Sequence, residues 1–395
     1  MKIFLFGFLI LLFLIFLDFF VGRVIQKFSK QRTHYPVRKG IIEIFTHGKD
    51  LFDDLFKEIQ SAKDHIHIEF YIARDDQFSQ SFFSILKTKA QEGVEVCLLL
   101  DRIGSHKVNK QMIKELEEAN VKFAFNNKPK MPLLFMINVR NHRKITIIDG
   151  KVGYTGGYNV GKEYIDLHPK LTPWRDYHLK ITGEAVQDLQ REFLRDWQES
   201  TKSMLMNLDY FPEQTGGVAN IEFVPSDGVT LEGDFIRLIL RAQHSIFIGT
   251  PYFIPSKLLF NELLQAINRG VQLTILVPCI TDHPLVQEAS YHYFRRLLPA
   301  GANIHQFMNG FYHSKVFLVD DQVCDIGTAN FDKRSLFLNY EMNCYIYDPQ
   351  VINRVKTIIE KDLLDSKKMT LKDLNQLGVW NSVKEGVARI LSPLL

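Results

Sequence analysis

The sequence predicts an α/β fold of two pseudo-symmetric domains, each a mixed, largely parallel sheet flanked by helices, with an N-terminal transmembrane helix. Three observations predict it. Amphipathic helical segments alternate with apolar strand segments, a pattern typical of α/β units. This pattern occurs twice along the chain, and an uninterrupted apolar segment precedes it. The length of 395 residues suffices for two or three domains with large cores.

The apolar segment runs from Ile3 to Leu17, and apolar residues resume after Asp18. About 20 residues span a bilayer as a helix, so the segment suffices if Asp18 lies at the interface. Six basic residues follow between positions 23 and 39, which predicts that the rest of the chain is cytoplasmic. A cleaved signal peptide is the alternative, but the apolar stretch is long and no small-x-small cleavage site follows.

The internal repeat begins after residue 40. The first strands of the two copies are expected at 66–73 and 246–255, and the second strands at 93–101 and 270–278. Each copy ends in a His-x-Lys strand, and a period near 170 residues is too long for a solenoid. It indicates two fused domains related by a pseudo-twofold axis.

We therefore expect five segments along the chain. They are a transmembrane anchor (1–22), a basic juxtamembrane linker (23–40), a first domain (41–205), a second domain (218–370) and a C-terminal amphipathic tail (371–395). The tail either lies on the membrane or, as is more common, packs on the second domain. The first copy also has about 12 extra residues within 128–141, with basic ends and an apolar middle. We expect them to form either a loop that contacts lipid or lines an acyl-chain channel, or a buried strand or hairpin.

Composition excludes several classes of site. The net charge of +3 is too small to indicate nucleic-acid binding by itself. The four cysteines form no C-x-x-C pair, and no Cys/His cluster has the spacing of a metal site. We interpret them as small core residues in a reducing compartment, which places the bulk of the chain in the cytosol.

The chemistry is carried by a sequence pattern that occurs once in each copy, H-x-K-x4-D, followed after six residues by a glycine-containing turn and an asparagine. Its members are His142, Lys144, Asp149, Gly156, Gly157 and Asn159 in the first copy, and His313, Lys315, Asp320, Gly327, Thr328 and Asn330 in the second. A lone His-x-Lys strand usually has no catalytic role. Recurrence of the whole pattern favours a catalytic site.

Residues two apart on a strand share a face, so each His and Lys should lie side by side. A glycine turn lets backbone N–H groups approach an anion, and the asparagine adds a donor. Two facing half-sites would therefore bind a phosphodiester. The lysines would neutralise its oxygens, one His would attack phosphorus, and the other would protonate the leaving oxygen. This chemistry requires no metal or other cofactor.

These paired motifs resemble the HKD signature of the phospholipase D superfamily, over about residues 45–365. The resemblance implies two fused phospholipase D-like domains with one active site at their interface, and a ping-pong reaction through a phosphohistidine. It implies that His142 is the nucleophile and His313 the acid and then the base, although either is chemically able.

The same resemblance implies a carboxylate downstream of each motif that orients an imidazole, here Asp176 and Glu341. A surface salt bridge with Arg175 is the alternative for Asp176, and Glu341 has a similar structural alternative. We interpret Asp149 and Asp320 as structural residues that hold the turn, although the family motif includes them.

Several segments are similar to bacterial cardiolipin synthases: PYFIPS (251–256), TDHPLV (281–286), GFYHSK (310–315), GTANFDKRSLFLNYE (327–341) and WRDYHLKITGEAVQDLQREFLRDW (174–197). This implies transfer of a phosphatidyl group between two phosphatidylglycerol molecules, giving cardiolipin and glycerol. Many such synthases have two N-terminal membrane helices, whereas this sequence has one apolar segment, so the acceptor alcohol is less determined than the chemistry.

Three alternatives remain open. A phospholipase D that admits water would release phosphatidic acid instead. A nuclease of the same superfamily would need stripes of Lys and Arg with aromatic platforms, and the anchor argues against it. A membrane scaffold would have no need of paired His and Lys. We therefore expect membrane phospholipids as partners and no nucleic acid, while oligomeric state and acyl preference are not determined by the sequence.

Overall fold

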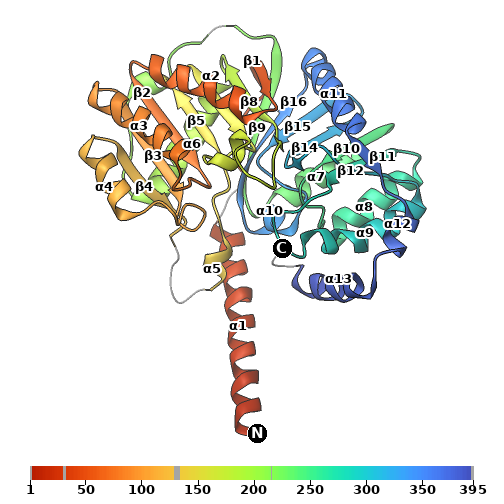
Figure 1. Cartoon of the computed structure of the whole chain (residues 1–395). Helices are drawn as coiled ribbons and strands as arrows, with labels where there is room; N and C mark the ends of the chain where they lie inside the picture. Colours follow the sequence, from red (N-terminus) through yellow and green to blue (C-terminus); the bar gives the residue numbers. More distant parts are fainter. Residues whose placement is uncertain (1, 30–32, 129–133, 215, 393–395) are drawn as a thin grey trace.

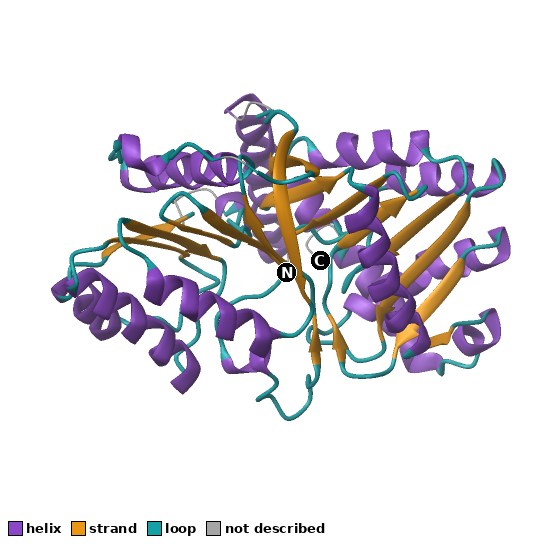
Figure 2. Cartoon of the chain, turned by 90° about the horizontal axis from the view of Figure 1, so that it is seen from above, coloured by secondary structure: helices purple, strands orange, loops and turns teal. Residues whose placement is uncertain are grey.

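The computed structural model describes residues 2–29, 33–128, 134–214 and 216–392. Within them the chain forms one mixed sheet of 15 strands, a separate two-stranded sheet, and helices on both faces of the large sheet (Figures 1 and 2). A single long helix projects away from this body at the N-terminus (Figure 1). The predicted mixed α/β architecture with an N-terminal apolar helix is confirmed.

The projecting helix, α1 (Lys2–Ser29), is the one helix among the described residues that is long and apolar enough to cross a membrane. Its apolar side chains are exposed along most of its length. Its last turns instead contact the body. Arg23 donates to the backbone oxygens of Gly228 and Phe337, and Gln26 donates to the backbone oxygen of Asp227 over 3.1 Å. The helix therefore continues past the expected end of the anchor at residue 22.

The first half of the large sheet contains seven strands. In spatial order they are β1 (Arg38–Phe45), β8 (His178–Thr182), β6 (Val152–Gly156), β5 (Ile145–Ile148), β2 (His65–Phe70), β3 (Glu95–Asp101) and β4 (Lys122–Asn126). The helices of this half are α2 (Gly48–Ser61), α3 (Gln77–Gln91), α4 (Lys110–Glu118), α5 (Phe135–Asn138) and α6 (Val186–Thr201), with 3-10 turns at Lys162–Ile165 and Leu208–Tyr210.

The second half repeats this order and adds one edge strand. Its strands are β9 (Ala219–Asp227), β16 (Tyr340–Ile346), β15 (Val323–Gly327), β14 (Val316–Val319), β10 (Ser245–Gly249), β11 (Gln272–Pro278), β12 (Asn303–Phe307) and β17 (Ser366–Lys368). Its helices are α7 (Leu231–Arg241), α8 (Lys257–Asn268), α9 (Val286–Ala300), α10 (Lys333–Phe337), α11 (Pro349–Leu364), α12 (Leu371–Asn375) and α13 (Val379–Leu391). Antiparallel pairing of β1 with β9 joins the two halves into one sheet.

Within the large sheet, parallel pairing is confined to two sets of three adjacent strands, β2–β3–β4 and β10–β11–β12. In the first half, the strands that follow one another in space from β1 through β8, β6 and β5 to β2 all pair antiparallel. In the second half, the same is true from β9 through β16, β15 and β14 to β10. The expectation of a largely parallel sheet thus holds only for the strands joined by crossover helices. The strands after each His-x-Lys sequence return through short turns, and a short turn can only make an antiparallel pair.

The two faces of the sheet are packed differently. On one face, α6 and α11 share a hydrophobic core cluster that contains residues from both halves. On the other face, α2–α4 and α7–α9 belong to two separate clusters, one for each half. The halves are therefore continuous through a common core along one face. All four cysteines are free, and three of them are buried.

The extra residues of the first copy lie partly outside the described residues, at 129–133. The part that follows forms neither a strand nor a hairpin but the short helix α5, which packs on α1. Phe135 is buried against Phe19, with ring centroids 5.9 Å apart. The carboxylate of Asp18 accepts from the backbone N–H groups of Leu134 and Phe135 at 3.0 and 2.7 Å. A carboxylate at this position satisfies backbone donors at the start of α5.

Candidate active site

The two His-x-Lys sequences lie in extended segments just before β5 and β14, rather than within those strands. The backbone N–H of His142 donates to the oxygen of Tyr340 over 2.9 Å, and that of His313 donates to the oxygen of Arg175 over 2.7 Å. Each bond crosses from one half of the molecule to the other. Next to the His313 bond, β7 (Trp174–Arg175) of the first half pairs with β13 (Phe311–Tyr312) of the second half and forms the small sheet. The chain thus leaves the large sheet here to contact the opposite half.

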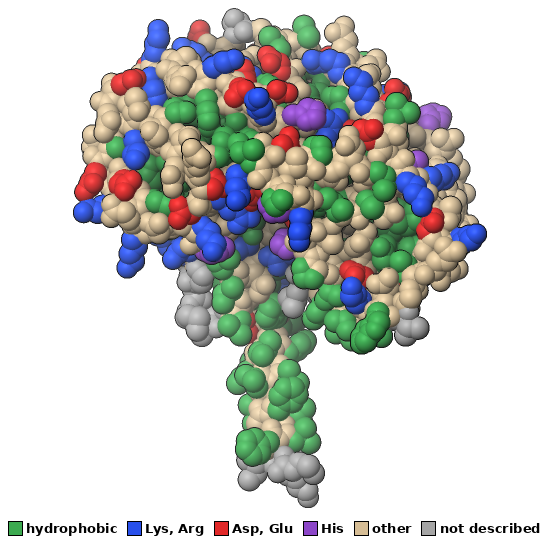
Figure 3. All heavy atoms as spheres, in the orientation of Figure 1, with side chains coloured by type: hydrophobic (Ala, Val, Ile, Leu, Met, Phe, Trp, Pro, Cys, Tyr) green, Lys and Arg blue, Asp and Glu red, His purple; other side chains and the backbone are tan. Residues whose placement is uncertain are grey.

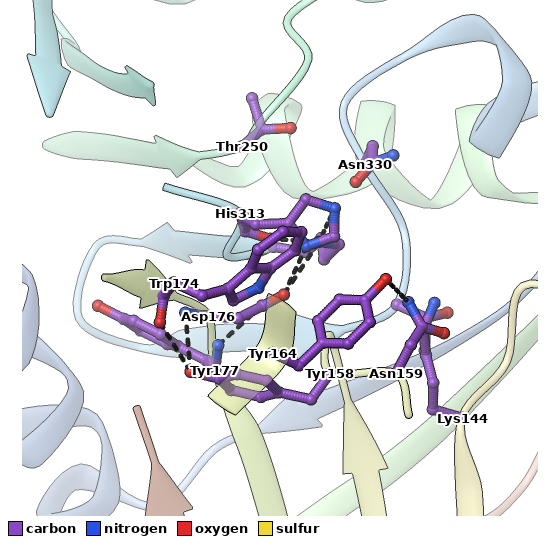
Figure 4. A network of polar contacts seen from close by, with 12 residues as sticks. Lys144, Tyr158, Asn159, Tyr164, Trp174, Asp176, Tyr177, Thr250, His313 and Asn330 are labelled. Carbon is purple, nitrogen blue, oxygen red and sulfur yellow. Dashed lines mark hydrogen bonds and ion pairs between the residues drawn. The ribbon is translucent and has the colours of Figure 1, made fainter. Parts of the chain in front are cut away.

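The two imidazoles are oriented by carboxylates in the same crossed manner. Nδ1 of His142 lies 2.8 Å from Oε2 of Glu341, and Nδ1 of His313 lies 2.6 Å from Oδ2 of Asp176. Figure 4 shows the second pair, with Lys144 of the other motif nearby. Because Nδ1 of each ring is held by a carboxylate, Nε2 is the nitrogen left for chemistry at phosphorus.

The Glu341 carboxylate is fully buried and accepts hydrogen bonds from three neighbouring side chains besides His142. The donors are Thr328 Oγ1 at 2.6 Å, Ser335 Oγ at 2.8 Å and Asn339 Nδ2 at 3.2 Å. Burial favours the neutral acid, but the interaction with His142, the charge of Lys144 and the hydrogen bond from Thr328 outweigh it and lower the pKa of Glu341. The carboxylate is therefore ionised and rigidly placed.

Asp176 has the equivalent role beside the second motif. Its carboxylate accepts from Nδ1 of His313 and lies 3.4 Å from Nζ of Lys315. Burial opposes ionisation here too, but the charge of Lys315 and the interaction with His313, including its hydrogen bond, hold the pKa of Asp176 below its usual value. The alternative of a surface salt bridge with Arg175 is wrong, since Asp176 is fully buried and Arg175 pairs with Asp362 at 2.7 Å.

Both lysines of the motifs are buried, and Nζ of Lys144 donates to the backbone oxygen of His142 over 2.8 Å. Burial lowers the pKa of Lys144 to about 7; the Glu341 carboxylate opposes this shift, and the charge of Lys315 adds to it. The pKa of Lys315 is also lowered, chiefly by burial. A bound phosphate diester would favour the protonated form of both lysines, so binding of the anion and protonation of the lysines reinforce each other.

The pKa values of the two imidazoles are lowered as well. Burial and then the charge of Lys315 lower the pKa of His313 to about 4, although the Asp176 carboxylate opposes the shift. Burial also lowers the pKa of His142. Without substrate both rings are therefore neutral near pH 7, the form in which an imidazole can attack phosphorus.

His142 and His313 line one groove, with a volume of about 1130 Å³. Aromatic side chains that the sequence analysis did not single out flank them. The ring of Tyr71 lies 4.9 Å from that of His142, and the ring of Trp174 lies 4.9 Å from that of His313, between centroids. Basic side chains also line the groove: Arg74, Lys107, Lys162 and Arg334. The groove therefore combines the two motif imidazoles with aromatic walls and with both basic and acidic side chains.

The glycines have a different role from the expected anion-binding turn. The backbone N–H of Gly157 donates to the oxygen of Tyr177 over 2.9 Å, and that of Thr328 donates to the oxygen of Met342 over 3.0 Å. These N–H groups are therefore engaged within the protein. A Cβ atom at Gly157 would overlap the Asp176 carboxylate, so the missing side chain allows that carboxylate to approach.

The other two glycines lie in the sheet, where Gly156 is opposite His178 and Gly327 is opposite Asn343. The asparagines fit the expectation better, because both line the groove. Asn159 donates to the hydroxyl of Tyr164 over 3.2 Å.

Arg143, the middle residue of the first His-x-Lys sequence, is fully buried at the junction of the two halves. Its guanidinium donates to Asp196 and to Asp227, both over 2.6 Å, and Nε donates to the backbone oxygen of Glu341 over 3.1 Å. It thereby links α6, β9 and β16. Sequence reasoning missed this residue, since the equivalent residue of the second copy is Ser314.

One group among the described residues could hold a metal ion. Ligand atoms of His67, Glu95 and Cys97 lie within 4.8 Å of one another. The sequence spacing did not reveal this group because it is assembled across the paired strands β2 and β3. Glu95 already pairs with Nζ of Lys122 at 2.5 Å, and none of these residues lines the groove. The group is therefore separate from the candidate active site.

The motif aspartates lie at the far ends of β5 and β14 and do not line the groove. The carboxylate of Asp149 accepts from the backbone N–H groups of Lys63, Asp64 and His65 over 2.8–3.2 Å. Asp320 makes the equivalent bonds to residues 243–245 over 2.6–2.8 Å. Both residues have a φ of +51°, in the left-handed region. They hold a turn against the start of a neighbouring strand.

Asp320→Asn is expected to lower the free energy of unfolding by about 1 kcal/mol without changing kcat. Asparagine tolerates the left-handed backbone but loses the charge that accepts three N–H donors. Burial opposes the ionised form, yet these donors lower the pKa of Asp320 in the folded state. The stabilisation is therefore present above the unfolded pKa of about 3.9 and is lost as pH falls through the folded value. Denaturant unfolding at pH 7 and at pH 3 would measure both effects. A large loss of kcat in a stably folded variant would instead place Asp320 in the reaction.

Comparisons with known proteins show the family of this chain. The family model described as "Cardiolipin synthase, PLD-like domain" matches residues 55–197 and 235–363. The minor cardiolipin synthase of Bacillus subtilis is 39% identical over 97% of this chain and 96% of its own length. The major cardiolipin synthase of the same organism is 39% identical over 90% of this chain and 75% of its own length.

The chain belongs to the PLD-like cardiolipin synthase family. The phospholipase D superfamily membership predicted from the paired motifs is confirmed, and each matched segment contains one motif, with His142 in the first and His313 in the second. Two solved structures share the fold of this chain. A phosphatidylserine synthase of Haemophilus influenzae gives a TM-score of 0.69 at 16% identity and covers 90% of this chain and 95% of its own. A polyphosphate kinase of Porphyromonas gingivalis gives a TM-score of 0.55 at 16% identity, over 90% of this chain and 55% of its own.

Proposed function

We propose that this protein is a cardiolipin synthase, a phosphatidyltransferase that converts two phosphatidylglycerol molecules into cardiolipin and glycerol. One observation supports this most strongly: two imidazoles, each held by a buried carboxylate from the opposite half, line a single groove with two buried lysines beside them. Family membership supplies the substrate class, since the relatives named above are cardiolipin synthases.

In the first step, Nε2 of His142 attacks the phosphorus of the donor phosphatidylglycerol. The bond from phosphorus to the glycerol oxygen breaks, and His313 gives that oxygen a proton, so glycerol leaves and a phosphatidyl-histidine remains. Lys144 and Lys315 offset the charge that builds on the non-bridging oxygens. The substrate anion raises the low pKa of His313, which allows it to hold the proton that the leaving oxygen requires.

In the second step, neutral His313 accepts a proton from the free hydroxyl of a second phosphatidylglycerol. The resulting oxygen attacks phosphorus, the bond to His142 breaks, and cardiolipin forms with both histidines restored. The first step replaces a P–O bond by a P–N bond and the second step replaces the P–N bond by a new P–O bond. The overall reaction therefore exchanges one phosphodiester for another and is reversible. Exclusion of water from this step distinguishes the synthase from a phospholipase D that releases phosphatidic acid.

We also propose that α1 spans the membrane and that the two halves lie on its cytoplasmic side. The helix has the required length and composition, and basic residues follow its apolar part. The groove would then lie near a surface that contains both substrates.

Purified protein incubated with labelled phosphatidylglycerol in EDTA is expected to yield cardiolipin and glycerol in equal amounts. Turnover should persist in the chelator because lysines provide the positive charge in this mechanism. Thin-layer chromatography of the lipids and enzymatic detection of glycerol would measure the products. Phosphatidic acid as the main product would assign the chain as a hydrolase, and loss of turnover in EDTA would contradict the mechanism.

A further inference from the structure

The helix α13 (Val379–Leu391) presents an apolar stripe to the outside of the molecule. Trp380 and Ile390 are 79% and 80% exposed, and Val383, Val387 and Leu391 are exposed as well. At about 100° per residue these five side chains fall within an arc of roughly 100° on one side of the helix. An exposed apolar stripe of this kind on an otherwise packed helix is typical of a contact surface.

The neighbouring side of α13 is fixed to the protein. Ala388 is fully buried in a cluster with Val286 and Ala289 of α9. Glu385 pairs with Arg295 at 3.0 Å, and Lys384 pairs with Glu288 at 3.4 Å. These contacts hold the helix in one orientation, so the stripe faces outward because of packing and not because the helix is loose.

The stripe lies at the end of the molecule from which α1 projects (Figure 1), and apolar side chains gather over α13 at that edge of the surface (Figure 3). The short helix α10 connects the two elements. Phe337, at one end of α10, accepts from Arg23 of α1, and Lys333, at the other end, donates to Ser392 just after α13 over 2.8 Å. A helix of this length spans only about 7 Å. The end of α13 therefore lies close to the point where α1 meets the body.

We propose that α13 lies on the surface of the lipid bilayer that α1 spans, with its apolar stripe inserted at the level of the headgroups. A bilayer around α1 would continue sideways to α13, so the two apolar surfaces share one lipid phase. Tryptophan at one end of the stripe suits this depth, because its ring prefers the boundary between acyl chains and water. The inference rests on the proposed location of α1 in a membrane and is independent of the chemistry at the groove.

Membrane contact by α13 would also set the height of the groove above the lipid. Ala388 packs on Val286, and Val286 lines the groove together with Tyr252 and His313. The second-half wall of the groove is thus one packed layer away from the stripe. With α1 and α5 at the junction of the halves, α13 would provide a second, laterally separate contact that prevents the body from tilting about a single anchor.

Fluorescence of Trp380 would test the proposal. The chain has three tryptophans, and the other two, Trp174 and Trp197, are only 3% and 5% exposed. The emission that Trp380→Phe removes can therefore be assigned to Trp380. The full chain would be reconstituted in phosphatidylcholine vesicles with or without dibrominated phosphatidylcholine, so no turnover is required. We expect the brominated lipid to reduce this emission at least about twofold, and aqueous iodide to leave it nearly unchanged.

Quenching by iodide alone would show that the stripe faces water. Protection from both quenchers would show that another protein surface, such as a second copy of the chain, covers it. Either result would overturn the proposal, whereas failure of the cardiolipin assay would leave it intact.

A double variant, Val383→Glu with Ile390→Glu, is expected to change quenching of Trp380 from brominated lipid to iodide. Ser382→Glu adds a carboxylate on the same helix outside the stripe, and it should leave the lipid quenching unchanged. Thermal unfolding of both variants would verify that α13 stays packed on α9. If the double variant keeps the lipid quenching of the unmodified chain, the stripe does not make the contact and the proposal is wrong.

Discussion

His142→Ala and His313→Ala are each expected to lower kcat for cardiolipin formation by at least about 10⁴-fold. The first variant loses the proposed nucleophile, and the second loses the group that protonates glycerol and then activates the acceptor hydroxyl. Because the two groups act in one reaction, the double variant should be scarcely slower than either single variant. Conversion of labelled phosphatidylglycerol would be measured for the three variants under the same conditions.

The roles of the two histidines can be separated with a donor whose leaving group is p-nitrophenol, which needs no proton. His313→Ala should then form a stable covalent phosphatidyl-histidine, while His142→Ala should form none. Mass spectrometry of the intact protein would detect the added group. Labelling of the His142→Ala variant alone would reverse the assignment, and the pseudo-symmetry of the two half-sites makes that outcome chemically possible.

A matched control is His244→Ala, which removes an exposed imidazole outside the groove. It should retain kcat within about twofold. Thermal unfolding of each variant would show whether loss of a buried imidazole disturbs the fold, since Glu341 or Asp176 then loses one hydrogen-bond donor. High activity in either the His142 or the His313 variant would contradict the two-histidine mechanism.

The motifs were predictable from the sequence because they are local. His-x-Lys, the aspartate seven residues after His and the later asparagine all lie within 18 residues of one another. The pairing of carboxylates with imidazoles was not predictable, since Glu341 lies 199 residues from His142 and Asp176 lies 137 residues from His313. Each carboxylate lies nearer in sequence to the histidine that it does not contact. Only the folded interface of the two halves reveals the crossing.

The fold shows the same limit. The repeated order of strands followed from hydrophobic pattern, but the antiparallel pairing of β1 with β9 joins segments about 180 residues apart and has no local signal. The buried role of Arg143 also depends on this junction, because its partners Asp196 and Asp227 come from later parts of the chain. Contacts between distant segments determine how the two half-sites face each other.

Glu341→Gln is expected to lower kcat by about 10²–10⁴-fold. Glutamine has one acceptor oxygen, whereas Glu341 accepts from His142, Thr328, Ser335 and Asn339. If the amide nitrogen faces His142, it donates to Nδ1 and places the ring proton on Nε2, which then cannot attack phosphorus. If the oxygen faces His142, the amide nitrogen instead lies against Nδ2 of Asn339. Both nitrogens are hydrogen-bond donors, so that hydrogen bond is lost. Single-turnover formation of the phosphatidyl-histidine would measure the loss.

The same variant should also change the pH dependence. Burial lowers the pKa of Lys144 to about 7, and the negative charge of Glu341 keeps this pKa from falling further. Removal of that negative charge lowers the pKa further, so the ammonium is lost at a lower pH and the alkaline decline in kcat should move toward acid. Glu222→Gln, which changes a carboxylate on β9 that bonds Tyr347 outside the groove, provides the control. A Glu341→Gln enzyme with kcat within threefold of the unmodified value and an unchanged pH profile would mean that the crossed carboxylate does not set the state of His142. In that case the geometry of the half-sites would need another explanation.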